Sequence, residues 1–339
     1  MADNEAVAID SARRTGLRAI SAVALGWVAL HANSPLHAQT TWPRGPIRLI
    51  VVYPPGGLSD DTARAIAERL ALRLGVPVRV ENRAGGGGSV GVDAVAKAAP
   101  DGHTLAFSAI SPLSLSPHLS KVGYDPFRDI APVASIMVTP VLLVGTPGFP
   151  GLDFRDLLTA AKAAPGKIRW ATSGSATVGH MVLEHVRLAS GADITHIPYK
   201  GGGQQLTDAL AGHFEVLSTN VASTALQYVH SGKFKPLAVG APTRLDVLPD
   251  VPTLAELGYP QANLTSLFGI FAPGKTPDGI VQRLNAEINA ILRQPEFQGR
   301  LKAVNNIPAM GSAAEFASQI AAESRNNARI IQAAHITLD

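Results

Sequence analysis

The chain contains no cysteine among its 339 residues. This absence excludes disulfide bonds, a thiolate nucleophile, a zinc site with cysteine ligands and a lipid-modified cysteine. An excess of one charge is also lacking, since 29 Lys and Arg residues stand against 26 Asp and Glu residues. Nucleic-acid binding needs a dense basic face, but no basic run is longer than the pair Arg13-Arg14. We therefore expect no nucleic acid among the partners.

Long apolar runs are scarce as well, and beyond the first 38 residues none reaches the ~20 residues of a transmembrane helix. In the N-terminal region a basic stretch, residues 13–18, precedes an apolar stretch, residues 19–30, of the length found in signal peptides. We interpret residues 1–38 as a secretory signal peptide and expect a soluble periplasmic protein that begins near Gln39. The alternative is an N-terminal extension of a cytosolic protein. The choice between the general secretory and twin-arginine routes stays open.

Apolar, β-branched runs alternate with amphipathic runs along most of the remaining chain. Short apolar runs indicate strands, and apolar residues spaced by three or four indicate helices. This alternation predicts an α/β fold with parallel sheets and helices on both faces. We predict strands at Ile47–Tyr53, Val78–Glu81, Thr104–Ser108, Val133–Val144, Ile168–Thr172, Ile194–Ile197, Glu215–Thr219 and Leu264–Phe271. We predict helices at Ser59–Leu74, Ser89–Ala98, Asp153–Ala164, Thr177–Ser190, Gly202–Ala211, Pro277–Leu292, Glu296–Val304 and Ser312–Ala334.

The C-terminal part of the chain is predicted to be helical and has no strands from which to build its own sheet. It must therefore pack on a sheet formed earlier in the chain. The simplest solution is a two-lobed fold in which the chain leaves lobe 1 near Val138–Pro140 and returns near Asn263–Phe271. We accordingly predict residues 39–139 and 263–339 as lobe 1 and residues 140–262 as lobe 2, with two hinge crossings and a cleft.

Two strand–turn–helix units share one pattern: IRLIVVYPPGGLSDDTARAIAERL begins at Ile47, and KIRWATSGSATVGHMVLEHV begins at Lys167. In each unit a turn rich in glycine and hydroxyl groups leads into a helix, whose first backbone N–H groups lack partners and attract an anion. We predict that the turns Pro54–Asp60 and Ser173–Thr177 hold a small acid from both sides of the cleft. Gly57 is expected to allow close approach and to adopt any positive φ that the first turn needs.

Three other patterns point to different chemistry but fit it poorly. The run Gly86–Gly91 has the form G-x-G-x-x-G, but it does not follow the first strand, so it indicates a turn and not a dinucleotide site. His180 and Glu184 share a helix face, but their spacing matches no zinc motif. Ser173 and Ser175 lack both a G-x-S-x-G elbow and an identifiable base. We therefore expect no cofactor, no metal and no catalytic residues.

A series of short motifs occurs in one order along the chain. The motifs are Pro46–Val51 with Pro54–Gly57 and Asp60, Glu81–Arg83, Pro100–Gly102, Tyr124–Pro126, Pro165–Lys167, Ser173-Gly174 with Thr177 and His180, His196–Gly201, Val251–Thr253 and Thr276-Pro277. Each is weak alone, but together and at this spacing they are specific. From about Trp42 to the C-terminus the chain resembles the substrate-binding proteins of tripartite tricarboxylate transporters, the Bug family of periplasmic receptors.

The resemblance implies a type II periplasmic-binding-protein fold, the Venus-flytrap architecture, that closes on a small organic acid and presents it to membrane permease subunits. The acid is a mono-, di- or tricarboxylate, aromatic acids included, and the receptor is expected to be a monomer and not an enzyme. The residues expected to bind the ligand are Tyr53, Pro54, Gly56, Gly57, Ser59, Asp60, Ser108, Ser173, Ser175, Ala176, Thr177, Thr219 and Asn220.

Three residues depart from the family pattern. Ala84 replaces the proline usual after Glu81-Asn82-Arg83, which should only soften a loop. Leu267 stands where a tryptophan is common, which predicts a changed hinge or cleft wall, and Thr219 stands where an aspartate is common. A carboxylate at Asp60 would repel an acid unless it shapes the turn, so helix capping and turn shaping both stay open for this residue. Two further functions also stay open: a ligand-sensing receptor that signals to a membrane sensor, and a secreted enzyme that acts on carboxylic acids.

Overall fold

The structure is a computed structural model that describes residues 42–333 and 335–337. Pro43–Asp339 form one compact unit. Within it the described residues build a mixed α/β structure, whose strands join by pairing into one ten-stranded sheet. The predicted signal peptide, residues 1–38, lies outside the described residues. No helix in the described part of the chain is long and apolar enough to cross a membrane.

The N-terminal strands form a parallel group in the order β2-β1-β3. The strands are β1 (Ile47–Val51), β2 (Val78–Asn82) and β3 (Thr104–Ala109), and the helices are α2 (Leu58–Leu74), α3 (Ser89–Ala96), α4 (Ser111–Ser114) and α5 (Ser116–Leu119). β1 is a buried run of isoleucine, leucine and valine apart from Arg48. Gly75 caps the C-terminus of α2, and its φ of 70° allows its N–H to donate to the Ala71 carbonyl and close the last turn.

A second parallel group has the order β7-β5-β6. Its strands are β5 (Arg169–Thr172), β6 (Thr195–Pro198) and β7 (Val216–Asn220), with β8 (Lys235–Gly240) nearby, and its helices are α6 (Phe154–Ala163), α7 (Val178–Ser190), α8 (Gly202–Leu210) and α9 (Ser223–His230). Trp170 on β5 is fully buried in a core that α6 and α7 complete. Each group therefore has its own apolar core beside its own strands.

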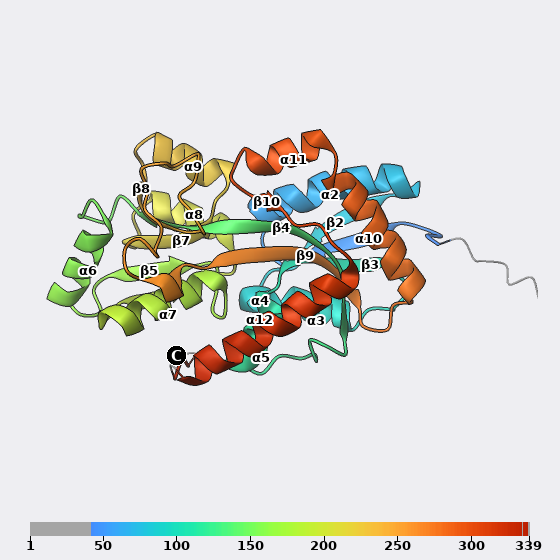
Figure 1. The fold of residues 1–339 in the computed structure, drawn as a ribbon, viewed down its shortest axis with the longest axis horizontal. Helices are drawn as coiled ribbons and strands as arrows, with labels where there is room; N and C mark the ends of the chain where they lie inside the picture. Colours follow the sequence, from blue (N-terminus) through green and yellow to red (C-terminus); the bar gives the residue numbers. More distant parts are fainter. Residues whose placement is uncertain (1–41, 334, 338–339) are drawn as a thin grey trace, which may run out of the picture. The chain divides into compact units, whose positions relative to one another are not determined.

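Two long antiparallel strands, β4 (Ile130–Gly145) and β9 (Thr265–Pro273), connect the groups. β4 pairs with β9 as far as Pro140, and from Val141 it pairs with β7 and β8 instead. β9 pairs with β3 on its other side, and Figure 1 shows both strands running between the two groups. The chain thus changes group where the hinge crossings are predicted. The division into two lobes stays a prediction.

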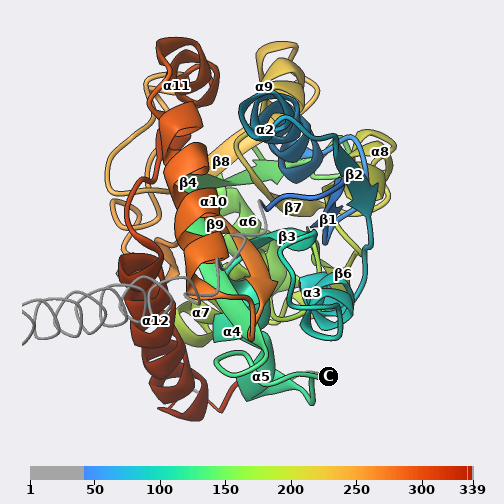
Figure 2. The same ribbon diagram turned by 90° about the vertical axis from the view of Figure 1, so that its right-hand side faces the viewer.

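The C-terminal helices pack on the first group, as predicted. These are α10 (Asp278–Leu292), α11 (Pro295–Lys302) and α12 (Ala313–Ala333), with the short strand β10 (Ile307–Pro308) between the last two. α10 and α12 both contact β4, α10 also contacts α2, and β10 pairs with β4 (Figures 1 and 2). The chain therefore returns to the first strand group after it has formed the second.

The expectation of parallel sheets holds within each strand group but not for the strands that join the groups. β9 is antiparallel to both β3 and β4, and β4 is antiparallel to β7 and β8. The reason is that the strands that carry the chain between the groups run in opposite directions. The elements α4, α5, α9, β8 and β10 were not predicted, and the segment 241–259 contains no helix or strand of its own.

Candidate functional site

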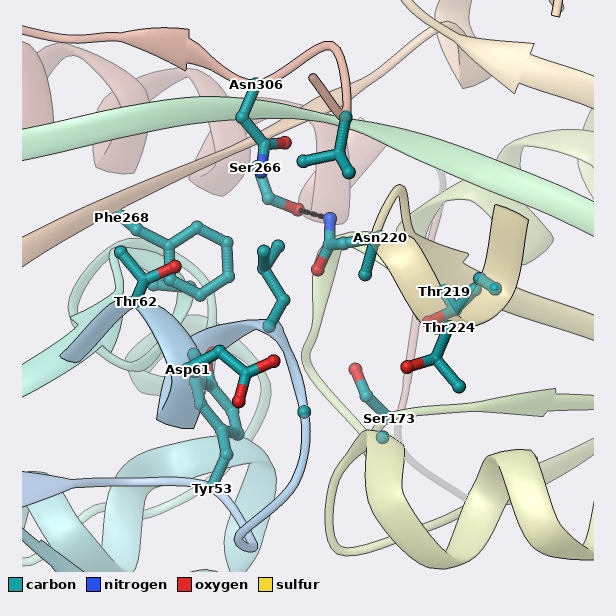
Figure 3. Close-up of a pocket in the computed structure, with 18 of the residues that line it drawn as sticks. Tyr53, Asp61, Thr62, Ser173, Thr219, Asn220, Thr224, Ser266, Phe268 and Asn306 are labelled. Carbon is teal, nitrogen blue, oxygen red and sulfur yellow. Dashed lines mark hydrogen bonds between the residues drawn. The ribbon is translucent and has the colours of Figure 1, made fainter. Parts of the chain in front are cut away.

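A cavity lies between the two strand groups, and both groups and the C-terminal segment contribute to its wall (Figure 3). Most of the residues predicted to bind a ligand line it: Tyr53, Pro54, Gly56, Gly57, Ser59, Ser173, Thr177, Thr219 and Asn220. The other four, Asp60, Ser108, Ser175 and Ala176, are not part of its lining. The role of all thirteen in binding stays a prediction.

Asp60 supports the first turn from behind the cavity wall. One carboxylate oxygen accepts from the Gly56 N–H at 3.1 Å and from Arg64 Nε at 3.0 Å, and the other accepts from Asn82 Nδ2 at 2.9 Å. Asn82 Nδ2 also donates to the Tyr53 carbonyl at 3.1 Å. Burial raises the pKa of Asp60, but the hydrogen bonds from Arg64, Asn82 and Gly56 outweigh it and leave the pKa below its usual value. The carboxylate therefore shapes the turn.

The positive φ of the first turn belongs to Gly56 and not to Gly57. Gly56 has a φ of 80°, whereas Gly57 has a φ of −104° and caps α2 without a side-chain bond. A Cβ atom at Gly57 would meet no atom within 4 Å. The expectation that Gly57 supplies the positive φ was therefore wrong, and the conformational need for glycine lies one residue earlier.

Tyr53 forms an aromatic wall together with Phe268 of β9. The two rings meet edge to face, with centroids 6.4 Å apart. Burial raises the pKa of Tyr53 to about 12, while hydrogen bonds with the Ser108 side chain and the Ala109 backbone act to lower it. The phenol is therefore neutral at physiological pH. Ser108 acts from behind Tyr53, since it is fully buried.

The second turn is held by hydrogen bonds within its own segment. Thr177 Oγ1 donates to the Gly174 carbonyl at 2.7 Å and accepts from the His180 N–H at 3.4 Å, so that it caps α7. Ala176 has a φ of 54°, unusual for a residue with a side chain, and its N–H donates to His180 Nδ1 at 3.3 Å. Ala176 thus contributes to the shape of the turn, while Ser173 and Thr177 face the cavity.

Two stacked histidines lie beneath the second turn. The rings of His180 and His196 have centroids 4.2 Å apart and planes within 14°. His196 Nε2 is 2.7 Å from Thr172 Oγ1, and His180 Nε2 is 3.4 Å from Glu184 Oε1. Burial, followed by the nearby positive charges, lowers the pKa of His196 to about 3. His196 is therefore neutral at physiological pH and supports the turn by stacking on His180. No cluster of metal-ligating side chains occurs among the described residues.

Each of the two turns touches a glycine of the opposite strand group. A Cβ atom at Gly87 would lie 2.5 Å from the Ser175 carbonyl oxygen, and one at Gly201 would overlap the Pro54 ring. Gly85–Gly88 all have positive φ, and a Cβ at Gly88 would press on Val52 and Pro112 at 2.9 Å. The glycine run is therefore a structural turn, as predicted. It also places the first strand group in contact with the second.

The first residues of three helices, which come from both strand groups, line the cavity. Gly57 and Leu58 of α2, Thr177–Gly179 of α7 and Ala222–Ala225 of α9 all line it. In α2 and α9 no side chain caps the first turn, so the backbone N–H groups are available to an anion. Of the described residues in the lining, only Asp61 and Arg300 are charged, and both are exposed. The cavity can therefore hold a negative group with neutral donors.

Sequence reasoning missed the part of the wall that comes from α9, β9 and the segment after α11. This part consists of Ser223, Thr224, Ser266, Phe268, Arg300, Leu301, Val304 and Asn306, among others. Ser266 and Phe268 are two residues apart on β9, so they lie on the same face of the strand. This spacing is the sequence signal that could have identified both as lining residues. Leu267, between them, points into the core of the first group, so this departure from the family pattern does not line the cavity.

Residues 62–336 match the family described as "Tripartite tricarboxylate transporter family receptor". The chain is 39% identical over 263 residues to the protein BugT of Bordetella pertussis, which covers 77% of this chain and 80% of that protein. Its fold matches the periplasmic binding protein BugD with a TM-score of 0.82, at 29% identity and covering 87% of this chain and 99% of that one.

Two further matching structures contain a ligand. One is an R. palustris protein with adipate, with 30% identity, a TM-score of 0.82 and coverage of 88% of this chain and 99% of that one. The other is MatC from Rhodopseudomonas palustris with bound malate, with 28% identity, a TM-score of 0.81 and coverage of 86% of this chain and 100% of that one. These likenesses establish the periplasmic-binding-protein fold. The chain belongs to the receptor family of tripartite tricarboxylate transporters, a family of periplasmic solute-binding proteins and not of enzymes.

Proposed function

We propose that this receptor captures a small carboxylate-bearing compound in the cavity and delivers it to the membrane permease subunits of a tripartite tricarboxylate-type transporter. The observation that carries the proposal is the meeting of α2 and α7, whose N-termini come from different strand groups, at one cavity. Partial positive charge at each helix N-terminus attracts a carboxylate without a cation or a metal. The adipate and malate bound by the two related structures support an acid of this class.

In this proposal the first turn and the second turn hold the carboxylate from opposite sides. Gly56, Gly57 and Ser59 approach it from the first turn, and Ser173 and Thr177 from the second. Thr219 and Asn220 contact the body of the ligand, while Asp60, Ser108, Ser175 and Ala176 act by shaping the two turns. Residues 39–139 and 263–339 move as one lobe and residues 140–262 as the other, after export and removal of residues 1–38.

A thermal-shift screen tests the capture of an acid. The purified protein is mixed with mono-, di- and tricarboxylates and aromatic acids, and a true ligand at 100 times its Kd should add ~2.7 kcal/mol to the free energy of unfolding. No shift with any acid would contradict the proposal. Once an acid is found, its uptake by cells that contain the matching permease should require this protein.

Ser173 and Ser175 provide a matched pair for locating the acid. Ser173→Ala removes a hydroxyl that lines the cavity, and a hydrogen bond to a charged group contributes about 1.5–3 kcal/mol, so affinity should fall roughly tenfold or more. Ser175→Ala removes a hydroxyl from the same turn that does not line the cavity, and affinity should stay close to that of the original protein. Calorimetry with the identified acid measures both. Equal effects would place the carboxylate elsewhere.

A further inference from the structure

Asn306 lines the cavity from the short segment between α11 and β10, a part of the chain that neither predicted turn includes. Its side chain is 1% exposed, and Figure 3 shows it reaching from the top of the cavity toward Ser266. Ser266 Oγ already accepts from Asn220 Nδ2 at 3.0 Å. Asn306 therefore lines the same cavity as a hydrogen-bonded pair of which it is not a member.

The backbone around Asn306 is fixed on both sides. Asn305, with a φ of 52°, accepts from the Val247 N–H at 3.2 Å, and the Asn306 N–H donates to the Leu301 carbonyl at 3.0 Å. Ile307 then pairs with Val138 in β4. The position of the side chain is thus set by the fold, independently of any bond that the amide itself makes.

Neither the nitrogen nor the oxygen of the Asn306 amide has a hydrogen-bond partner in the described protein. Buried polar groups are normally satisfied, and those that are not call for a specific explanation. Even the half-buried amide of Asn263 is satisfied, since it accepts from the Ala241 N–H at 3.2 Å and donates to the Ala241 carbonyl at 2.7 Å. A ligand in the cavity is the partner that the position of Asn306 offers.

We propose that Asn306 determines specificity by binding a neutral group that both donates and accepts a hydrogen bond, a hydroxyl or a carboxamide, at the end of the ligand away from the carboxylate. This inference rests on the proposed capture of an acid. A second carboxylate only accepts, so it would satisfy the amide nitrogen and place negative charge beside the amide oxygen. Hydroxy acids and acid amides should therefore bind better than plain dicarboxylates of the same length.

Matched pairs of acids test this preference by calorimetry. 4-Hydroxybutyrate carries a terminal hydroxyl where succinate carries its second carboxylate, and the monoamide of adipic acid carries a carboxamide where adipate carries its second carboxylate; pairs of other lengths extend the series. The original protein should prefer the hydroxyl or amide member roughly tenfold, the effect of two neutral hydrogen bonds. Asn306→Leu should reduce that preference to about one, because it can make neither bond. Asn306→Ser, which is too short to reach, should do the same if the leucine variant does not fold.

Stability of the ligand-free protein separates a binding role from a structural one. An amide without partners contributes nothing to folding, so Asn306→Leu should unfold at the same temperature as the original protein or higher. Asn263→Leu is the control, and it should lower that temperature because both bonds to Ala241 are lost. If Asn306→Leu lowers the temperature as much as the control, or if it leaves the preference among acids unchanged, the inference is wrong. Binding of no acid at all would overturn the proposed function itself.

Discussion

At the scale of single residues, Asp60 shows how a carboxylate can support the turn of the proposed acid-binding site from behind the cavity wall. Asp60→Asn keeps the shape of the side chain but replaces an acceptor of the Gly56 and Arg64 N–H groups by a donor. Hydrogen bonds to a charged group contribute about 1.5–3 kcal/mol, so the free energy of unfolding should fall by that order and binding should weaken as the turn loosens. Urea unfolding and calorimetry measure the two effects.

Asp61 is the control for this prediction. It is the next residue of α2, it lines the cavity mouth, and it is exposed. Asp61→Asn should change the free energy of unfolding by less than about 0.5 kcal/mol, as most surface substitutions do. A similar loss in both variants would show that Asp60 acts only through the charge near the start of α2 and not through its bonds to the turn.

His196 predicts the pH dependence of stability. Its pKa is about 3 in the folded protein and ~6.5 in an unfolded chain, so the unfolded chain binds more protons between these values. The stability that a neutral His196 contributes is therefore fully present above pH ~6.5 and is lost progressively as the pH falls toward 3. In His196→Gln, the free energy of unfolding should depend less steeply on pH than in the original protein. The slopes should differ by up to the amount that the uptake of one proton on unfolding produces. Identical slopes would mean that His196 is not shielded from protonation.

At the scale of elements, α9 is the addition that the structure makes to the predicted site. Figure 3 shows Thr224 of α9 and Ser173 of the second turn pointing into the same cavity. Ser223→Pro removes one backbone N–H at the first position of the helix, where proline is tolerated, and the extended backbone at Ala222 suits a following proline. If this N–H contacts the acid, affinity should fall roughly tenfold.

Ser223→Ala is the partner of this variant, since it removes the hydroxyl and keeps the N–H. Its effect should be clearly smaller than that of Ser223→Pro. Circular dichroism and thermal unfolding establish that both variants keep the fold. Two equal losses of affinity would assign the contact to the hydroxyl, and no loss in either would remove the N-terminus of α9 from the ligand's surroundings.

The elements that could be predicted from sequence are those with a strong local pattern. β1, α2, β5 and α7 have β-branched or amphipathic runs bounded by glycine, and their predicted bounds differ by one or two residues from those observed. The eight residues of α9 are too few for a clear helical period. The direction of β9 and the change of partner within β4 depend on how distant segments meet. No local pattern encodes them.

The same reason explains which site residues were found. The two turns line the cavity with their own backbone and adjacent side chains, so they are visible in the sequence as local motifs. Asn306 and Phe268 face the cavity only because the chain returns to the first strand group after forming the second. Asp60 and Ser108 were found as site residues, but their positions behind the wall follow from packing that the sequence does not display.

At the scale of the whole molecule, the glycine contacts across the cavity predict what limits closure. The flytrap mechanism expects the two strand groups to separate and approach, and Gly201 meets Pro54 where they touch. Gly201→Ala should hold them apart, lower affinity and abolish the ligand-induced decrease in the radius of gyration measured by X-ray scattering. Its φ of 139° also strains any larger residue, so thermal unfolding of the free protein is measured alongside.

Gly202→Ala is the matched control for closure. Gly202 is the neighbouring residue, its φ is not in the glycine-favouring region, and a Cβ atom there would meet nothing within 4 Å. The variant should bind and contract like the original protein. Contraction of Gly201→Ala to the same radius, with unchanged affinity, would mean that the contact between Gly201 and Pro54 plays no part in closure.

The neutral wall of the cavity has a consequence for the salt tolerance of binding. A site that held its acid through lysine or arginine at the surface would weaken as dissolved ions screened the attraction. Here the donors are backbone and hydroxyl groups, and the two charged residues at the wall, Asp61 and Arg300, are exposed and of opposite sign. The Kd should therefore change by less than about threefold between about 0.05 and 0.5 M sodium chloride. If a cation carried the affinity, titrations across that range would show a Kd that rises steeply with the salt concentration. A Kd that stays nearly constant would mean that the receptor works equally well in dilute and in salty surroundings.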